Sequence, residues 1–129
     1  MKGFRILHAA AVAAALGVLA TAARAQELPE GVTEAMIKEG ATLFSGAGIC
    51  AACHGPDAKG IPNLGGDLTD QEWVHSDGSF EGIVKSILEG VSADKSTTGT
   101  VMPPKGGSQL NESQVKAVAA YVWSLRRKG

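Results

Sequence analysis

The sequence predicts an all-α fold. Three segments place apolar residues three and four positions apart, the spacing that aligns side chains on one face of a helix. Each of them follows a residue that can cap a helix, and a capping-box pattern marks a fourth, shorter helix. No alternating run of β-branched residues and no Asn-Gly turn indicates a strand ladder. We therefore expect four or so helices, joined by connections rich in glycine and proline.

The first 25 residues are typical of a cleaved secretory signal. Two basic residues precede an almost wholly small and apolar stretch, residues 6–23, and Ala23-Arg24-Ala25 fits a cleavage site. The alternative is an uncleaved membrane anchor, since about 18 apolar residues could just span a bilayer. Alanine dominates the stretch and makes it only weakly hydrophobic, which favours cleavage. We expect residues 1–25 to be removed and residues 26–129 to form one domain located in the periplasm.

Composition restricts the classes of partner. Removal of the signal would leave nine basic residues against 13 acidic ones, a net charge of −4. Such a surface argues against nucleic acid and anionic lipid as partners. The whole chain contains only three Phe, two Trp and one Tyr. A core so poor in large side chains indicates that something other than protein fills it.

The first predicted helix runs from Glu34 to about Ser45. Thr33 is its expected N-cap, and Gly46 is expected to end it. Its apolar stripe consists of Met36, Ile37, Gly40, Leu43 and Phe44.

Three further helices are predicted downstream. The capping-box pattern of residues 69–72 opens a short helix that reaches about His75. Ser79 caps the next helix, which Gly90 ends, and Asn111 with Gln114 opens the last one. The apolar stripes of these two helices are Phe80, Ile83, Val84, Ile87 and Leu88, and Val115, Val118, Ala119, Val122 and Leu125. The basic residues 126–128 lie where the negative end of the last helix dipole favours them.

The two cysteines of the chain lie three residues apart, and a histidine directly follows the second. This Cys-x-x-Cys-His pattern is the attachment signature of c-type haem. Positions i, i+3 and i+4 of a helical turn point the same way. Cys50 and Cys53 can therefore form thioethers to two vinyl groups of one porphyrin, while His54 reaches the iron.

Three other interpretations of the cysteines are weaker. A redox dithiol of the thioredoxin type needs a βαβ context, which the sequence lacks. A structural zinc ion needs more ligands than Cys50, Cys53, His54 and the distant His75 supply comfortably. A disulfide between Cys50 and Cys53 would close too small a loop to stabilise the fold much.

Residues 26–129 resemble the class I cytochromes c, of the small soluble bacterial type. The resemblance is carried by Cys50-Ala51-Ala52-Cys53-His54-Gly55, by Gly60-Ile61-Pro62-Asn63-Leu64, by Met102-Pro103-Pro104 and by a C-terminal helix with Tyr121-Val122-Trp123-Ser124-Leu125. It implies a cytochrome c fold wrapped around one covalently bound haem c. Residues 68–73 and 119–125 look most like bacterial small cytochromes, including domains attached to haem-copper oxidases.

The resemblance also implies the two axial ligands of the iron, His54 and Met102. A thioether is a soft, neutral ligand that favours ferrous iron and raises the reduction potential. Met102 is in a loop stiffened by two prolines, whereas Met36 lies on a helical stripe and is expected in the core. His75 is the other possible distal ligand, although a solvated surface histidine is expected there.

Supporting roles are implied for four further residues. The backbone carbonyl of Pro62 is expected to accept a hydrogen bond from His54, and Leu64 is expected to pack on the haem face. Gly40 is expected to allow close crossing with the last helix, near Val118 and Tyr121. Trp73 is either a donor to a haem propionate or an ordinary core residue.

The function implied is that of a monomeric, exported electron carrier between redox proteins, with membrane respiratory complexes as the expected partners. Catalysis and a small-molecule substrate are not expected. A local basic rim formed by Lys59 and Lys105 is a hypothesis for docking. The alternatives are a subunit of a larger respiratory or sulfur-oxidising complex, and a five-coordinate haem protein that binds gases or acts as a peroxidase.

Overall fold

The computed structural model describes residues 27–126 and confirms the all-α prediction for this part of the chain. Its four α-helices are α1 (Glu34–Ser45), α2 (Ala51–His54), α3 (Phe80–Glu89) and α4 (Glu112–Leu125). A short 3₁₀ turn, η1 (Pro104–Gly107), precedes α4. The predicted signal lies outside the described residues. Across residues 27–126, no helix combines the length and the apolar character required to cross a membrane.

The predicted caps define the three longer helices. The Thr33 side chain accepts a hydrogen bond from the backbone N–H of Met36, and the Ser79 side chain accepts one from Gly82. Asn111 and Gln114 form the complete capping box of α4. These side chains satisfy N–H groups that have no partner inside the helix. The bounds of these helices therefore follow from local sequence.

The predicted helix at residues 69–75 is wrong, because this segment contains only bends. The Asp67 carboxylate accepts hydrogen bonds from the backbone N–H and the hydroxyl of Thr69, and the Asp70 carboxylate accepts one from the N–H of Glu72. These are local turns, and they use the groups that a helix would begin with. The fourth α-helix is instead the turn that contains the Cys-x-x-Cys-His motif.

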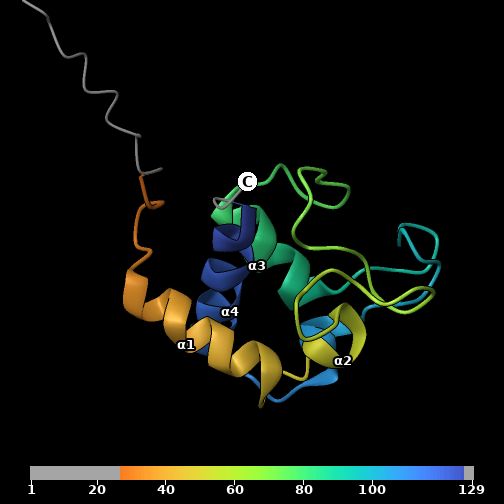
Figure 1. The fold of residues 1–129 in the computed structure, drawn as a ribbon, viewed down its shortest axis with the longest axis horizontal. Helices are drawn as coiled ribbons and strands as arrows, with labels where there is room; N and C mark the ends of the chain where they lie inside the picture. The colour runs from red at the N-terminus through yellow and green to blue at the C-terminus, as the bar shows by residue number, and fades with distance from the viewer. Residues whose placement is uncertain (1–26, 127–129) are drawn as a thin grey trace, which may run out of the picture.

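Helices α1 and α4 cross and pack against each other, and α3 packs against α4 from another side (Figure 1). The crossing places Gly40 of α1 against α4, where a Cβ atom would collide with the Ala117 carbonyl and approach the Tyr121 Cβ to 2.8 Å. The close approach expected for Gly40 is therefore present, with Ala117 rather than Val118 as the second contact.

Large side chains do not fill the interior. The largest fully buried side chains of the described residues are Phe44, Val115 and Val118. The rest of the buried core consists of aliphatic residues, most of them from α3 and α4, of alanines, and of Phe80 at the start of α3. This composition leaves space between the helices and the long connections that face them.

Gly40→Ala should destabilise the folded protein by about 1–3 kcal/mol, because a new methyl group would be forced into the helix crossing. Alanine would raise intrinsic helix propensity by about 1 kcal/mol, so the propensity alone predicts the opposite sign. Denaturant unfolding of the purified holoprotein measures the change.

Ala35→Gly is the matched control, because Ala35 is exposed on the same helix. It should lose only the propensity difference of about 1 kcal/mol. A stabilised Gly40→Ala variant would contradict the tight crossing.

Candidate haem site

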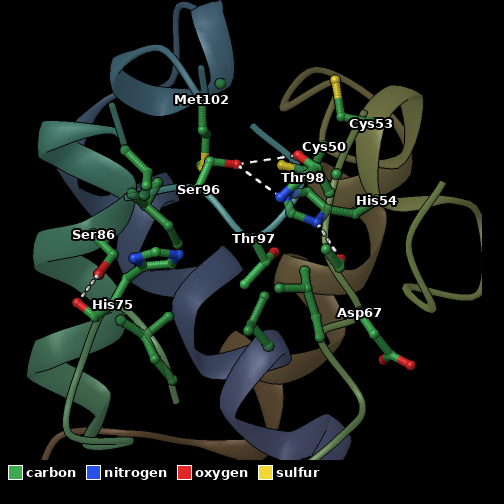
Figure 2. A pocket seen from close by; sticks show the side chains of 18 of the residues that line it. Cys50, Cys53, His54, Asp67, His75, Ser86, Ser96, Thr97, Thr98 and Met102 are labelled. Carbon is green, nitrogen blue, oxygen red and sulfur yellow. Dashed lines mark hydrogen bonds between the residues drawn. The ribbon is translucent and has the colours of Figure 1, made fainter. Parts of the chain in front are cut away.

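A cavity of about 430 Å³ lies between α2, α3, α4 and the connections that face them. Its volume lies within the range of roughly 300–1,000 Å³ that is usual for ligand sites. Aliphatic and aromatic side chains from three helices and two connections form much of its wall: Phe44, Leu68, Trp73, Ile83, Ile87, Leu110, Val118 and Val122. The structure brings Cys50, Cys53, His54, Leu64 and Met102 together around this one space (Figure 2).

Helix α2 presents the motif on a single turn. Cys50 is the N-cap, and the His54 N–H donates to the Cys50 carbonyl at 2.9 Å. The Cys50 sulfur points into the cavity, and the Cys53 sulfur lies farther out on the same turn (Figure 2). Burial raises the pKa of the Cys50 thiol, so this thiol is protonated at neutral pH. Among the described residues, no cluster of three or more His, Cys, Asp or Glu is placed to hold a metal ion.

The His54 ring is oriented by a backbone carbonyl. Its Nδ1 lies 2.8 Å from the Gly66 carbonyl oxygen. A carbonyl can only accept, so Nδ1 is the donor in this contact, and Nε2 is the ring nitrogen left to ligate a metal. This arrangement suits a histidine that ligates a metal, because such ligands usually donate their other ring N–H to an oxygen.

Pro62 does not supply this carbonyl, and the expectation for it is therefore wrong. Ile61 and Gly65 pair through their backbones, which leaves Pro62 exposed at the tip of a turn and outside the cavity wall. Gly65 packs where a Cβ would collide with the Cys53 carbonyl, and this contact brings the next residue, Gly66, beside His54. Leu64 does line the cavity and is 39% exposed.

Met102 enters the cavity from a different part of the fold (Figure 2). Its backbone pairs with Val91, which follows α3, through hydrogen bonds of 2.8 and 2.9 Å. Gly90 is required beside this pair, because it has a φ of +73° and a Cβ there would collide with the Met102 carbonyl. Met102 is thus restrained twice. Its backbone is anchored beside the end of α3, and Pro103 and Pro104 stiffen the residues that follow it. Met36 packs against the core instead, as predicted.

The irregular segment 69–77 contributes several residues to the cavity wall, among them Trp73 and His75. His75 is exposed, as expected, yet its ring faces the same space as Met102 (Figure 2). It therefore stays a possible distal ligand on geometry. Trp73 carries the guanidinium of Arg126 over its ring, 3.1 Å from the centroid. The sequence analysis did not identify Gly66, Val91 or Arg126 as part of the site. Only Arg126 could have been found from the sequence, because it continues the four-residue spacing of Val118 and Val122 on the inward face of the last helix.

Charges of both signs border the cavity. Lys105 lines it, whereas Lys59 does not, and the acidic residues Asp67, Asp70 and Glu72 line it as well. Hydrogen bonds from Thr69 lower the pKa of the Asp67 carboxyl, which keeps it ionised. Only one of the two lysines proposed for a basic rim is therefore in position.

The sequence model of the cytochrome c family matches residues 37–126. The chain belongs to the cytochrome c family. Haem c, bound covalently, is therefore its cofactor, and electron transfer is its function. The cavity fits this group, since its apolar walls, its two thiols and its oriented histidine match the donor set that haem c requires.

Curated relatives of this cytochrome c are oxidase subunits. The cbb3-type cytochrome c oxidase subunit CcoP of Rubrivivax gelatinosus is 37% identical over 78 residues, which cover 60% of this chain and 23% of that protein. The subunit FixP of Bradyrhizobium sp. is 40% identical over 88 residues, which cover 67% and 26%. The chain thus spans about a quarter of the length of these relatives.

A solved structure is also similar. Cytochrome CL from the marine methylotrophic bacterium Methylophaga aminisulfidivorans is 26% identical, with a TM-score of 0.55. The match covers 72% of this chain and 55% of that one. The cytochrome c fold predicted from the sequence is confirmed by this likeness and by the family match.

Replacement of both cysteines, Cys50→Ala with Cys53→Ala, should abolish covalent attachment. Haem should then leave the protein in acidified organic solvent and on a denaturing gel, whereas it stays with the wild type. The chain has no other cysteine. Each single variant is the control, because one thioether should still retain the haem. Covalent haem in the double variant would contradict the assignment.

Proposed function

We propose that this chain is an exported single-haem carrier that passes one electron at a time between redox proteins in the periplasm, after removal of residues 1–25. The observation that carries the proposal is the convergence of the α2 turn and the Met102 loop on one apolar cavity. When bound, haem c supplies an iron that alternates between Fe(II) and Fe(III).

The roles of the chain's own residues follow from the geometry. The Cys50 and Cys53 thiols would hold the haem covalently. Each would be linked as a thioether by addition of its S–H across one vinyl group, which needs no oxidant. His54 offers its free Nε2 as the proximal ligand, because Gly66 holds the proton on Nδ1. Met102 offers its sulfur as the distal ligand.

Both proposed ligands are held by backbone as well as by side-chain contacts. His54 belongs to a hydrogen-bonded helical turn. The backbone N–H and C=O of Met102 both form hydrogen bonds with the backbone of Val91. Ligands fixed in this way have little freedom to move when the iron changes its charge. Such a site suits electron transfer rather than catalysis, and we propose no substrate and no enzymatic activity for this domain.

The second candidate is a subunit or accessory module of a larger respiratory complex. The observation in its favour is the similarity to the cbb3-type oxidase subunits CcoP and FixP. The electron-transfer chemistry would be the same. Four exposed apolar side chains that line the cavity offer a docking surface in either case: Ile49, Leu64, Val74 and Val101. Contact over so small a surface would be weak and transient for a free carrier.

Met102→Ala should open the sixth position of the iron. The reduced wild-type protein should keep its low-spin spectrum when carbon monoxide is added, whereas the spectrum of the variant should change. The reduction potential of the variant should fall, because the soft sulfur that favours ferrous iron is lost. Absorption spectra before and after carbon monoxide, and a redox titration, measure both effects.

Two variants serve as controls for Met102→Ala. Met36→Leu changes a methionine that packs in the core and should leave both readouts unchanged. His75→Ala should also leave them unchanged. An open site in His75→Ala with a closed one in Met102→Ala would transfer the distal role to His75. Carbon monoxide binding by the wild type would overturn electron transfer through a six-coordinate iron and favour the gas-binding alternative.

Fractionation of host cells separates the two candidate functions. A free carrier should be released with the periplasmic fraction and migrate as a monomer in gel filtration. A complex subunit should sediment with the membranes and copurify with a haem-copper oxidase. Retention in the membrane by an uncleaved signal is recognised by the intact N-terminus of the isolated chain.

A further inference from the structure

The guanidinium of Arg126 has one buried nitrogen without an acceptor. Arg126 directly follows α4, and its side chain is 8% exposed. Its Nη1 has no hydrogen-bond partner, and no other buried side-chain nitrogen or oxygen in residues 27–126 is in this state. Buried guanidinium N–H groups are rarely left unpaired, because the loss of water is then uncompensated. The missing acceptor is therefore not part of the described polypeptide.

The rest of the group is fixed on all sides. Its Nε donates to the Leu68 carbonyl at 3.2 Å, and its Nη2 donates to the Glu72 carbonyl at 3.0 Å. Nη2 also lies 3.5 Å from a carboxylate oxygen of Asp70, and the Trp73 ring covers one face of the guanidinium. Because the guanidinium is rigid and planar, these contacts also set the direction of its Nη1.

Arg126 lines the same cavity as Cys50 and His54. The C-terminal end of α4 lies across the molecule from α2 (Figure 1). In haem the two vinyl groups and the two propionates are on opposite edges of the porphyrin. A porphyrin attached at α2 therefore directs its carboxylates away from α2, towards the part of the cavity that Arg126 borders.

We propose that Arg126 binds a haem propionate through Nη1, an inference that rests on the haem position given under the proposed function. A carboxylate supplies the missing acceptor and forms a charge-assisted hydrogen bond. A propionate in this cavity needs a positive charge beside it, because Asp67, Asp70 and Glu72 line the same cavity and would repel an uncompensated carboxylate. Asp70, the carboxylate already paired with Arg126, is 46% exposed and so offers only a screened countercharge.

A buried positive charge beside the haem opposes the extra positive charge of the ferric state. Arg126→Gln should therefore lower the reduction potential. At the wild-type midpoint the ratio of ferric to ferrous protein should rise about tenfold, which corresponds to ~59 mV for one electron. Redox titration of the purified holoprotein at fixed pH and ionic strength measures this change.

A second readout addresses the bond itself. Haem labelled with ¹³C at its propionate carboxylates gives carboxylate bands in the redox-induced infrared difference spectrum. These bands should shift in Arg126→Gln. Arg126→Lys keeps the charge but has no fork, so it should shift the bands with a smaller fall in potential. It also provides a result if the glutamine variant does not fold.

Asp70→Asn is the matched control, because it removes the ion pair and keeps the hydrogen bonds from Arg126 to the Leu68 and Glu72 carbonyls. It should leave the propionate bands unshifted and should not lower the potential. If Arg126 only ties down residues 68–72, the Asp70 and Arg126 variants should lower the potential together, and the bands should stay unchanged in both. If the wild type also has a normal low-spin spectrum, that result would overturn the proposed bond between Arg126 and the propionate and leave the proposed function in place. A wild type without a low-spin haem spectrum would overturn the proposed function with it.

Discussion

The close crossing of α1 and α4 at Gly40 is the constraint on which the haem cavity depends. Tyr121 lies at this crossing and packs edge-on against Phe44, with ring centroids 5.3 Å apart. Phe44 in turn faces His54, with centroids 6.5 Å apart. A chain of contacts thus runs from the helix crossing to the turn that carries the cysteines. Any side chain at Gly40 would disturb this series of contacts. The position of α2 therefore depends on a glycine ten residues before Cys50.

The opposite wall of the cavity is held independently. Met102 takes its position from α3. Its backbone pairs with Val91, and Gly90 lets the two backbone segments approach each other. Since α3 packs on α4, the helix α4 is the common support of both walls. The separation of the two proposed ligands is therefore set by helix packing and not by the loop that carries Met102. The 22 residues between α3 and α4 can be largely irregular without making the site loose.

Much of this fold could be predicted from local sequence, because caps and apolar stripes act over three or four residues. The predictions for α1, α3 and α4 are confirmed for this reason, whereas the α2 turn was expected from the spacing of the Cys-x-x-Cys-His motif. The segment after Asp67 was mispredicted because local turns at Asp67 and Asp70 compete with the helix start, and a contact distant in sequence supports those turns. The Arg126 side chain donates to the carbonyls of Leu68 and Glu72, and these contacts from 54 or more residues away fix the path of the segment. The carbonyl beside His54 was missed for a similar reason, since it depends on the packing of Gly65 against Cys53.

The charge distribution around the cavity bears on how a partner approaches. Lys105 and the acidic residues 67, 70 and 72 border the same cavity, and at physiological salt charges are screened beyond about 8 Å. Charges of opposite sign on the border of one cavity offset each other in part for a distant partner, so long-range steering at this face is weaker than at a patch of a single sign. Recognition would then rest on short-range contact with the exposed apolar side chains, which tolerates either a passing partner or a permanent neighbour. The similarity to oxidase subunits is consistent with this property, because a domain held beside its acceptor does not need electrostatic steering.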